Sequence, residues 1–533
     1  MMVLDDQEAR DAIANDLEST FVVEAAAGTG KTTELVRRIV RVLATGKASV
    51  GDLVAVTFTE KAAGELKLRL RQELERGTGD SGLDAASRAR LDAALMNLEE
   101  AHVSTIHGFC ADLLRERPVE AGVDPLFRVL TEGEARRLYA EAFDAWLQET
   151  LENMPEGVRR SLRRSARPAI PGGDASDDGP IDRLRSAGWD LVEWRDFTGA
   201  WSRPDFDRHG SIAALVRSVH ECAATTSRAA SARDPLFVDT AAVRRTSEEL
   251  RLIMAAADND AAEAALVDLC RQRDFRRARK GMGASFARGV ARADVQAALQ
   301  SLLQQLDVFK ADADADLAAL LRHELQGAID RYERLKAAHG ALDFLDLLLR
   351  ARDLLRNRSD VRGHFQQRFS RLFVDEFQDT DPLQAEILLL LSADDDRETD
   401  WRRARPRPGT LFLVGDPKQS IYRFRRADVG IYKEVCERLE AQGARLLRLN
   451  TSFRSVPEIQ ACVNNAFGPV MTGDPVTLQA SYVPLAPHRD SLAGQPAVIA
   501  LPVPEPYKWR YLSAGAIEQS LPSAVAASRR SAS

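Results

Sequence analysis

The chain has 533 residues, of which 45% are hydrophobic and 29% are charged, and its formal net charge is −7. This length exceeds the size at which one hydrophobic core keeps growing, so we expect two or more domains. The acidic balance argues against a protein that simply coats nucleic acid. No run approaches the roughly 20 apolar residues of a membrane span, and the N-terminus lacks a signal-peptide pattern, so we expect a cytoplasmic protein without membrane contact.

The first motif is a glycine-containing loop between a strand pattern and a helix pattern. Residues 24–33 read Glu-Ala-Ala-Ala-Gly-Thr-Gly-Lys-Thr-Thr and follow the apolar run 21–23. Gly28 and Gly30 allow successive N–H groups to point inward at a phosphate group, and the following helix presents its positive end to the same anion. The residues expected to bind a nucleotide are Ala25, Ala26, Ala27, Gly28, Thr29, Gly30, Lys31, Thr32 and Thr33.

Two side chains of this loop carry the expected chemistry. Lys31 is expected to reach the β- and γ-phosphates, and the Thr32 hydroxyl to ligate Mg²⁺. The strict phosphate-loop pattern has glycine where this chain has Ala25, which is tolerable only at negative φ. The alternative is a glycine-rich turn that binds nothing. Apolar residues at helical spacing over 35–43 match the context of a phosphate loop and favour the binding site.

Two further strand patterns, at 53–56 and 103–106, each lead into a helix pattern. Thr57 and Phe58 follow the first strand, and His107 follows the second. Alternating strands and helices predict a parallel α/β sheet, in which ligands gather at the carboxyl ends of the strands. From about 126 to 340, residues recur at helical spacing with few strand signals, which predicts an inserted helical domain.

A second strong site follows the strand pattern 372–374, which runs into Asp-Glu-Phe-Gln-Asp-Thr-Asp. Adjacent carboxylates at the end of a buried strand suit a site for a nucleotide with magnesium. We assign Asp375 to Mg²⁺ and Glu376 to the attacking water. An acidic helix N-cap is the alternative. It is disfavoured because four acids lie within seven residues and accompany an independent phosphate loop.

The strand pattern 411–414 ends in a segment that mixes polar, aromatic and basic residues. Gln419 is placed to sense the γ-phosphate. Tyr422 and Phe424 could stack on bases, with Arg425 on the backbone, since aromatic stacking is worth roughly 1–3 kcal/mol per base. The alternative is that these rings belong to the hydrophobic core.

The next strand pattern, 447–449, is expected to open a second sheet. Arg454 lies just past it, as an arginine finger that reports the state of the nucleotide would. By itself, this residue would be only a surface arginine.

Taken together, these motifs resemble those of the UvrD/Rep-type superfamily-one DNA helicases, most closely the RecB/AddA branch of helicase–nucleases. The resemblance implies an ATP-driven motor that uses ATP and Mg²⁺ and moves along single-stranded DNA in repair or recombination, with three-prime to five-prime polarity. It implies that Gln7 contacts adenine, that Phe453 stacks near it, and that Arg454 reaches the γ-phosphate. It also implies contacts to single-stranded DNA from Thr57, Phe58, His107, Tyr422, Phe424 and Arg425.

The same resemblance implies a RecA-like P-loop fold in the α/β class. The first motor lobe would comprise residues 1–125 and 341–445, around the helical insert 126–340, and residues 446–533 would begin an incomplete second lobe. Relatives continue into the rest of that lobe and a nuclease domain, so we expect this chain to correspond to their amino-terminal half. The expected partners are single-stranded DNA or a tailed duplex and a companion helicase–nuclease subunit.

Two other functions stay open on the sequence. One is a truncated remnant, or one part of a split helicase, that binds nucleotide and DNA without hydrolysis. The other is a P-loop kinase or another NTPase that ignores DNA, which the positions of Phe58, Tyr422 and Phe424 disfavour.

Overall fold

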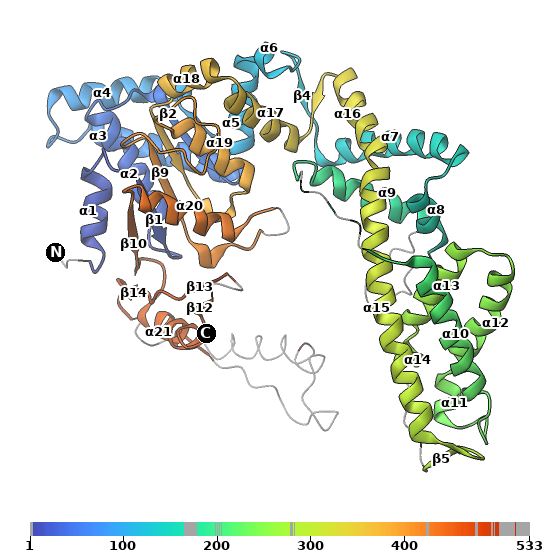
Figure 1. Ribbon diagram of the computed structural model, residues 1–533. Helices are drawn as coiled ribbons and strands as arrows, with labels where there is room; N and C mark the ends of the chain where they lie inside the picture. The colour runs from blue at the N-terminus through green and yellow to red at the C-terminus, as the bar shows by residue number, and fades with distance from the viewer. Residues whose placement is uncertain are drawn as a thin grey trace. The chain divides into compact units, whose positions relative to one another are not determined.

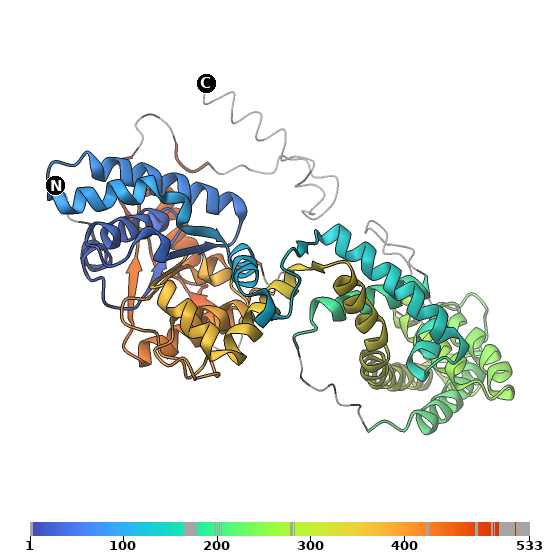
Figure 2. The same cartoon turned by 90° about the horizontal axis from the view of Figure 1, so that it is seen from above.

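The computed structural model describes residues 4–164, 179–197, 199, 201, 203, 205–277, 281, 283–422, 426–474, 478–491, 494, 496–499 and 518. The chain divides into two compact units, one formed by residues 1–126 and 346–533 and the other by residues 127–345 (Figures 1 and 2). Among the helices in this part of the chain, none is both long and apolar enough to cross a bilayer.

A six-stranded parallel sheet forms the centre of the first unit, with its strands in the order β10, β1, β9, β8, β2, β3 (Figure 1). Strands β2, β8 and β9 are buried along their whole length, as a parallel sheet covered on both faces requires. The predicted parallel α/β sheet is therefore confirmed. The strands are β1 (Phe21–Ala25), β2 (Leu53–Thr57), β3 (His102–Thr105), β8 (Arg371–Val374), β9 (Leu411–Gly415) and β10 (Arg445–Leu449).

Four helices pack on one face of this sheet and share a hydrophobic core with it. Alternate strand residues such as Phe21, Phe373 and Phe412 point into this core. The helix pattern predicted after the strand 53–56 is confirmed, and the buried residues of that helix are Ala63, Leu66, Leu70 and Leu74. The four helices are α1 (Gln7–Asn15), α2 (Lys31–Ala44), α3 (Glu60–Thr78) and α4 (Ala85–Met96).

The remaining helices of the first unit include α19, in which every residue after the first is buried. The α-helices are α5 (Ile106–Glu116), α6 (Pro118–Ala121), α17 (Phe344–Asn357, which begins in the second unit), α18 (Ser359–Arg368), α19 (Pro382–Ser392), α20 (Val429–Ala441) and α21 (Pro457–Phe467). Short 3₁₀ helices are η1 (Val50–Asp52), η2 (Leu98–Glu100), η3 (Phe377–Asp379) and η4 (Pro417–Gln419).

The expectation that residues 447–449 open a second sheet is wrong. Strand β10 pairs with β1 along its whole length, from Arg445 opposite Phe21 to Leu449 opposite Ala25, and so forms an edge of the first sheet. Its two exposed arginines and its less exposed leucines suit a half-exposed edge strand, but a strand pattern alone does not reveal its partner. Beyond it lie two small pairs, β11 (Thr451–Ser452) with β14 (Ala486–Pro487) and β12 (Thr472–Asp474) with β13 (Gln479–Ser481).

The second unit is mainly helical. Its described residues include two hydrophobic cores, one around α10, α12, α13 and α15 and the other around α7, α9 and α16. Its helices are α7 (Glu132–Glu152), α8 (Glu156–Arg163), α9 (Pro180–Glu193), α10 (Arg208–Thr226), α11 (Pro235–Asp239), α12 (Ala241–Ala255), α13 (Asn259–Arg271), α14 (Arg273–Arg276), α15 (Arg292–Glu324) and α16 (Gln326–Ala338). Its short strands are β4 (Arg128–Val129) with β7 (Ala341–Leu342) and β5 (Ser285–Ala287) with β6 (Val290–Ala291).

Buried ion pairs tie four helices of the second unit together. The Arg160 guanidinium, on α8, lies 3.0 Å from a carboxylate oxygen of Glu263 and 2.6 Å from one of Asp316. Arg208, on α10, pairs with the same Glu263 at 2.6 Å. Because one unpaired member would leave a buried charge uncompensated, the cluster fixes how these helices pack.

Candidate nucleotide site and adjoining aromatic pair

The glycine loop connects β1 to α2 in the conformation that phosphate binding needs. Gly28 has φ +79° and Gly30, the residue before α2, has φ +85°, a region that residues with a Cβ rarely enter. Ala25 is the last residue of β1 and does not have positive φ, so its methyl group causes no strain. The Thr29 hydroxyl donates to the Ala26 carbonyl at 2.8 Å, which closes the turn.

The loop and the acidic segment after β8 meet through two contacts between side chains. The Lys31 ammonium lies 2.7 Å from a carboxylate oxygen of Glu376. The Thr32 hydroxyl donates to Asp375 Oδ2 at 3.3 Å. Residues more than 340 positions apart are thereby brought to one point at the carboxyl ends of β1 and β8.

Burial raises the pKa of two of the buried aspartates in this segment. It raises the pKa of Asp375 to about 6, with a further rise from the neighbouring Glu376 charge and an opposing effect from Lys31. Burial and the Glu376 charge likewise raise the pKa of Asp379 to about 6. A cation bound beside these carboxylates would relieve this repulsion.

The oxygen atoms at this point fit a magnesium ion. Magnesium binds oxygen ligands at about 2.0–2.1 Å in an octahedron, so neighbouring ligand oxygens lie roughly 3 Å apart. The 3.3 Å between Thr32 Oγ1 and Asp375 Oδ2 suits that spacing. The positive-φ glycines and Lys31 fit the phosphate groups that would supply further ligands.

Glu376 is held from a second side by Gln378, in η3. Glu376 has φ +56°, which a non-glycine residue adopts only where its surroundings impose it. The Gln378 amide donates to Glu376 Oε2 at 2.8 Å, and its carbonyl oxygen accepts from the backbone N–H of Asp416 at 2.8 Å. The Gln419 amide donates to Asp416 Oδ2 at 2.8 Å, so Gln419 is linked to Glu376 through two intermediates.

The segment after β10 lies against the glycine loop. The Phe453 N–H donates to the Gly28 carbonyl at 2.8 Å. A Cβ added at Gly28 would meet Arg454 Cβ at 2.6 Å, so this close approach needs glycine. Arg454 is exposed beside the loop. Gln7 is the first residue of α1, and its amide donates to Asp11 Oδ1 at 2.9 Å.

Buried contacts of Arg10 join α1 to the glycine loop and to the segment after β10. The Arg10 guanidinium contacts Asp6, Glu34 and the Thr29 carbonyl, at 2.8–3.0 Å. It also lies over the Phe453 ring, 5.0 Å from its centroid. Sequence reasoning missed Asp6 and Arg10, and an acidic residue four positions before an arginine on a helix was the available signal.

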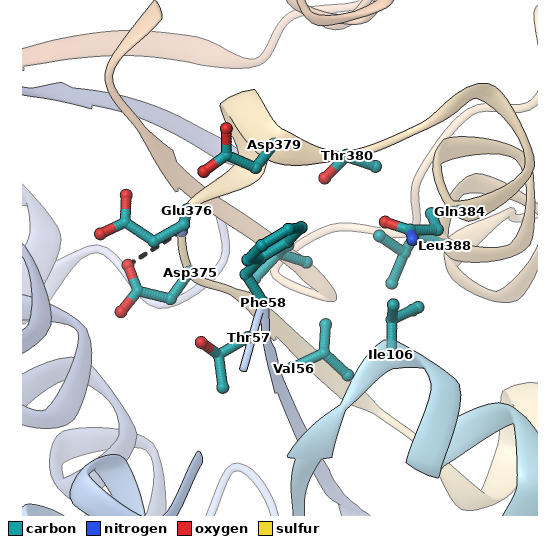
Figure 3. A pocket seen from close by; sticks show the side chains of 11 residues that line it. Val56, Thr57, Phe58, Ile106, Asp375, Glu376, Asp379, Thr380, Gln384 and Leu388 are labelled. Carbon is teal, nitrogen blue, oxygen red and sulfur yellow. Dashed lines mark hydrogen bonds between the residues drawn. The ribbon is translucent and has the colours of Figure 1, made fainter. Parts of the chain in front are cut away.

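Two of the six residues expected to contact DNA form an aromatic pair beside the carboxylates. The Phe58 and Tyr422 ring centroids lie 4.6 Å apart, and both rings are partly exposed. Figure 3 shows Phe58 between the carboxylates of Asp375 and Glu376 and the apolar side chains that line the same pocket, Ile106 and Leu388.

Of the other four expected DNA contacts, two lie among the described residues and two fall outside them. Thr57 lines the pocket, and its buried hydroxyl has no hydrogen-bond partner in the described part of the chain. His107 lies in the first turn of α5, where burial lowers its pKa to about 4 against a weaker opposing effect of Glu60. Phe424 and Arg425 lie outside the described residues.

The sequence family described as UvrD/REP helicase N-terminal domain matches residues 5–440. This chain belongs to that family. The family match runs from before α1 into the last turn of α20 and so includes the glycine loop, the acidic segment and the aromatic pair.

Curated relatives described as subunits of an ATP-dependent helicase/nuclease align with most of this UvrD/REP-family chain. The protein from Pelotomaculum thermopropionicum is 30% identical over 501 residues, which cover 85% of this chain and 37% of the relative. The protein from Syntrophomonas wolfei is 26% identical over 517 residues, covering 87% of this chain and 38% of the relative. The Latilactobacillus sakei protein is 27% identical, covering 85% and 53%. The chain thus spans well under two thirds of each of these relatives.

Proposed function

We propose that this chain is the ATP-binding motor region of a DNA helicase of the RecB/AddA type, acting on single-stranded DNA in repair or recombination. Family membership and the names of the relatives support this proposal. One observation carries it: Lys31 and Thr32 of the glycine loop meet Glu376 and Asp375 of the acidic segment. Neither segment alone makes a nucleotide site, and the two together have the parts that phosphoryl transfer requires.

In this proposal, each side chain has a distinct task. Lys31 leaves Glu376 and binds the β- and γ-phosphates of ATP, while Thr32 and Asp375 hold Mg²⁺, which neutralises charge on the phosphates. Glu376 orients and deprotonates the attacking water. Gln419 and Arg454 respond to the γ-phosphate, and Gln7 and Phe453 bind the adenine.

Single-stranded DNA is proposed to bind at the partly exposed rings of Phe58 and Tyr422. Stacking accepts any base, so little sequence preference is expected. The other proposed contacts are Thr57, His107, Phe424 and Arg425. By family analogy, the motor would move three-prime to five-prime and work with a companion helicase–nuclease subunit. The helical unit would be an insert in the first motor lobe, and a second lobe would begin after Leu449, since β10 belongs to the first sheet.

The test is ATP turnover by the purified chain with and without an oligothymidylate. The proposal predicts magnesium-dependent turnover that rises when DNA is added. Turnover that ignores DNA would favour an NTPase of another class. Binding of both ligands without turnover would identify a non-catalytic binding protein.

A further inference from the structure

Gln378 occupies a position between the two sites that the proposed function uses. Its side chain is buried, with the residue only 2% exposed, and lies in η3 between β8 and α19. The amide nitrogen donates to Glu376 Oε2 at 2.8 Å and to Asp379 Oδ2 at 3.3 Å. The amide oxygen accepts from the Asp416 N–H at 2.8 Å, and the backbone carbonyl accepts from the Ser420 hydroxyl at 3.1 Å.

The end of β9 is shaped to allow this contact. A Cβ added at Gly415 would lie 2.9 Å from Gln378 Oε1 and 3.1 Å from Tyr432 Cε2. Any larger residue would therefore push the Gln378 amide away from the strand. The absence of a side chain at position 415 lets the Asp416 N–H reach Gln378.

On the nucleotide side, Gln378 determines where the Glu376 carboxylate lies once Lys31 turns to phosphate. In this structure, Glu376 Oε2 accepts from both Lys31, at 2.7 Å, and Gln378, at 2.8 Å. Lys31 is the partner that the nucleotide removes in the proposed function. The Gln378 amide then remains to hold the carboxylate.

On the DNA side, Gln378 is bonded to the segment that carries Tyr422. Asp416 is fixed within this segment by the Lys418 ammonium and the Gln419 amide, each at 2.8 Å. Tyr422 follows Ser420 by two residues and faces Phe58. A displacement of this segment when a base stacks on Tyr422 must change the two bonds that it makes to Gln378.

We propose that Gln378 is a positioning residue that couples DNA binding at Phe58 and Tyr422 to the orientation of Glu376 in the nucleotide site. This inference rests on the proposed function. Coupling between two binding equilibria is reciprocal, so each ligand changes the affinity for the other by the same factor. A purely structural glutamine would satisfy buried polar groups without linking the two equilibria.

The experiment measures the dissociation constant of a non-hydrolysable ATP analogue with Mg²⁺, in the absence and presence of saturating oligothymidylate. For the unaltered chain, the two constants should differ by roughly five-fold or more, the lower end of typical allosteric coupling. In Gln378→Met, which removes all three hydrogen bonds of the side-chain amide at similar side-chain length, the ratio should approach one. The affinity for each ligand alone should change little.

Exchanging the amide of Gln378 with the carboxylate of Glu376 distinguishes a positioning role of Gln378 from a role in packing alone. Gln378→Glu keeps an oxygen for the Asp416 N–H but loses the donor to Glu376, and should lose the coupling. Adding Glu376→Gln gives a new amide at position 376 that can donate to the new carboxylate at position 378. The double variant should therefore regain the coupling between nucleotide and DNA binding. This rescue also keeps the test decisive if Gln378→Met does not fold.

Gln366→Met is the matched control. Gln366 is buried in the same unit, and its amide donates to the Leu390 carbonyl at 2.9 Å, outside the pathway described here. The Gln366→Met variant should be less stable than the unaltered chain and should keep the coupling between nucleotide and DNA binding. Coupling that persists in Gln378→Met or Gln378→Glu, or that is absent from the unaltered chain when it binds both ligands, would overturn the inference. Failure of the unaltered chain to bind nucleotide or DNA would instead overturn the proposed function. The affinity for each ligand alone therefore shows whether the inference or the proposed function has failed.

Discussion

Replacing Arg10 with methionine should destabilise the first unit strongly. The side chain of Arg10 is only 4% exposed, and those of its partners Asp6 and Glu34 are 2% and 5% exposed. Burial alone would raise the pKa of Asp6, but hydrogen bonds from Arg10 and Thr451 outweigh it and hold that pKa below its usual value. Arg10→Met keeps most of the apolar stem and leaves two buried carboxylates without their shared cation.

The loss in the free energy of unfolding depends on which hydrogen bonds and ion pairs the Asp6 and Glu34 carboxylates retain. Removing one member of a buried ion pair typically costs roughly 3–5 kcal/mol. Asp6 keeps three bonds, from the N–H groups of Asn450 and Thr451 and from the Thr451 hydroxyl, each at 3.0 Å. Glu34 keeps Arg37 at 3.2 Å. We therefore expect the lower end of the range, about 3 kcal/mol in the free energy of unfolding.

Urea unfolding of matched variants provides the assay. Arg37→Met removes the other cation from the same Glu34, but the Arg37 side chain is 54% exposed, and exposed pairs contribute roughly 0–1 kcal/mol. Comparing the two variants cancels the contribution of the second unit. Arg10→Met should also weaken nucleotide binding, because Arg10 holds the Thr29 carbonyl and packs on Phe453. Equal stability of the two variants would refute the reasoning.

Three further changes test the candidate sites. Glu376→Gln should still bind ATP but lower any turnover by roughly 10²–10⁴-fold, the usual worth of a general base; lost binding in a titration would instead make Glu376 a metal ligand. Phe58→Ala should weaken oligothymidylate binding by roughly 1–3 kcal/mol in fluorescence anisotropy, whereas unchanged affinity with a lower melting temperature would assign the ring to the core. The pKa of His107 is about 4 in the folded chain against an ordinary 6.5. The unfolded chain therefore binds more protons between these values, so stability should fall as the pH drops from 6.5 to 4, and less steeply in His107→Gln. If the melting temperature of the unaltered chain and that of His107→Gln change equally with pH over this range, the lowered pKa of His107 would be contradicted.

Local patterns were sufficient to predict most of the first sheet. The apolar runs 53–56, 372–374 and 411–414 all lie within observed strands, because a strand buried on both faces needs a continuous apolar run. The partner of β10 could not be predicted in this way. Its pairing with β1 joins residues more than 420 positions apart, and the sequence of an edge strand does not specify its neighbour.

In the candidate site, too, residues within short motifs could be predicted, and residues that depend on distant contacts could not. Lys31 and Asp375 could be singled out because each lies in a short motif with its own chemistry. Asp6 and Arg10 showed only the spacing of a helical ion pair, and no short motif marked Gln378, since the importance of all three depends on which distant groups they contact. An arginine on an amphipathic helix is usually solvated, and only the fold shows that Arg10 is buried between Asp6 and Glu34.

Nucleotide binding by the chain and by Lys31→Ala tests the central claim most directly. The Lys31 ammonium is the positive side-chain charge of the glycine loop, and its partner Glu376 is the group that the proposal assigns to the attacking water. Calorimetric titration with ATP and Mg²⁺ should show one saturable site in the unaltered chain. It should show loss of tight binding in Lys31→Ala, with an unchanged melting temperature. Equal affinity in the two proteins would contradict the assignment of this loop as the nucleotide site.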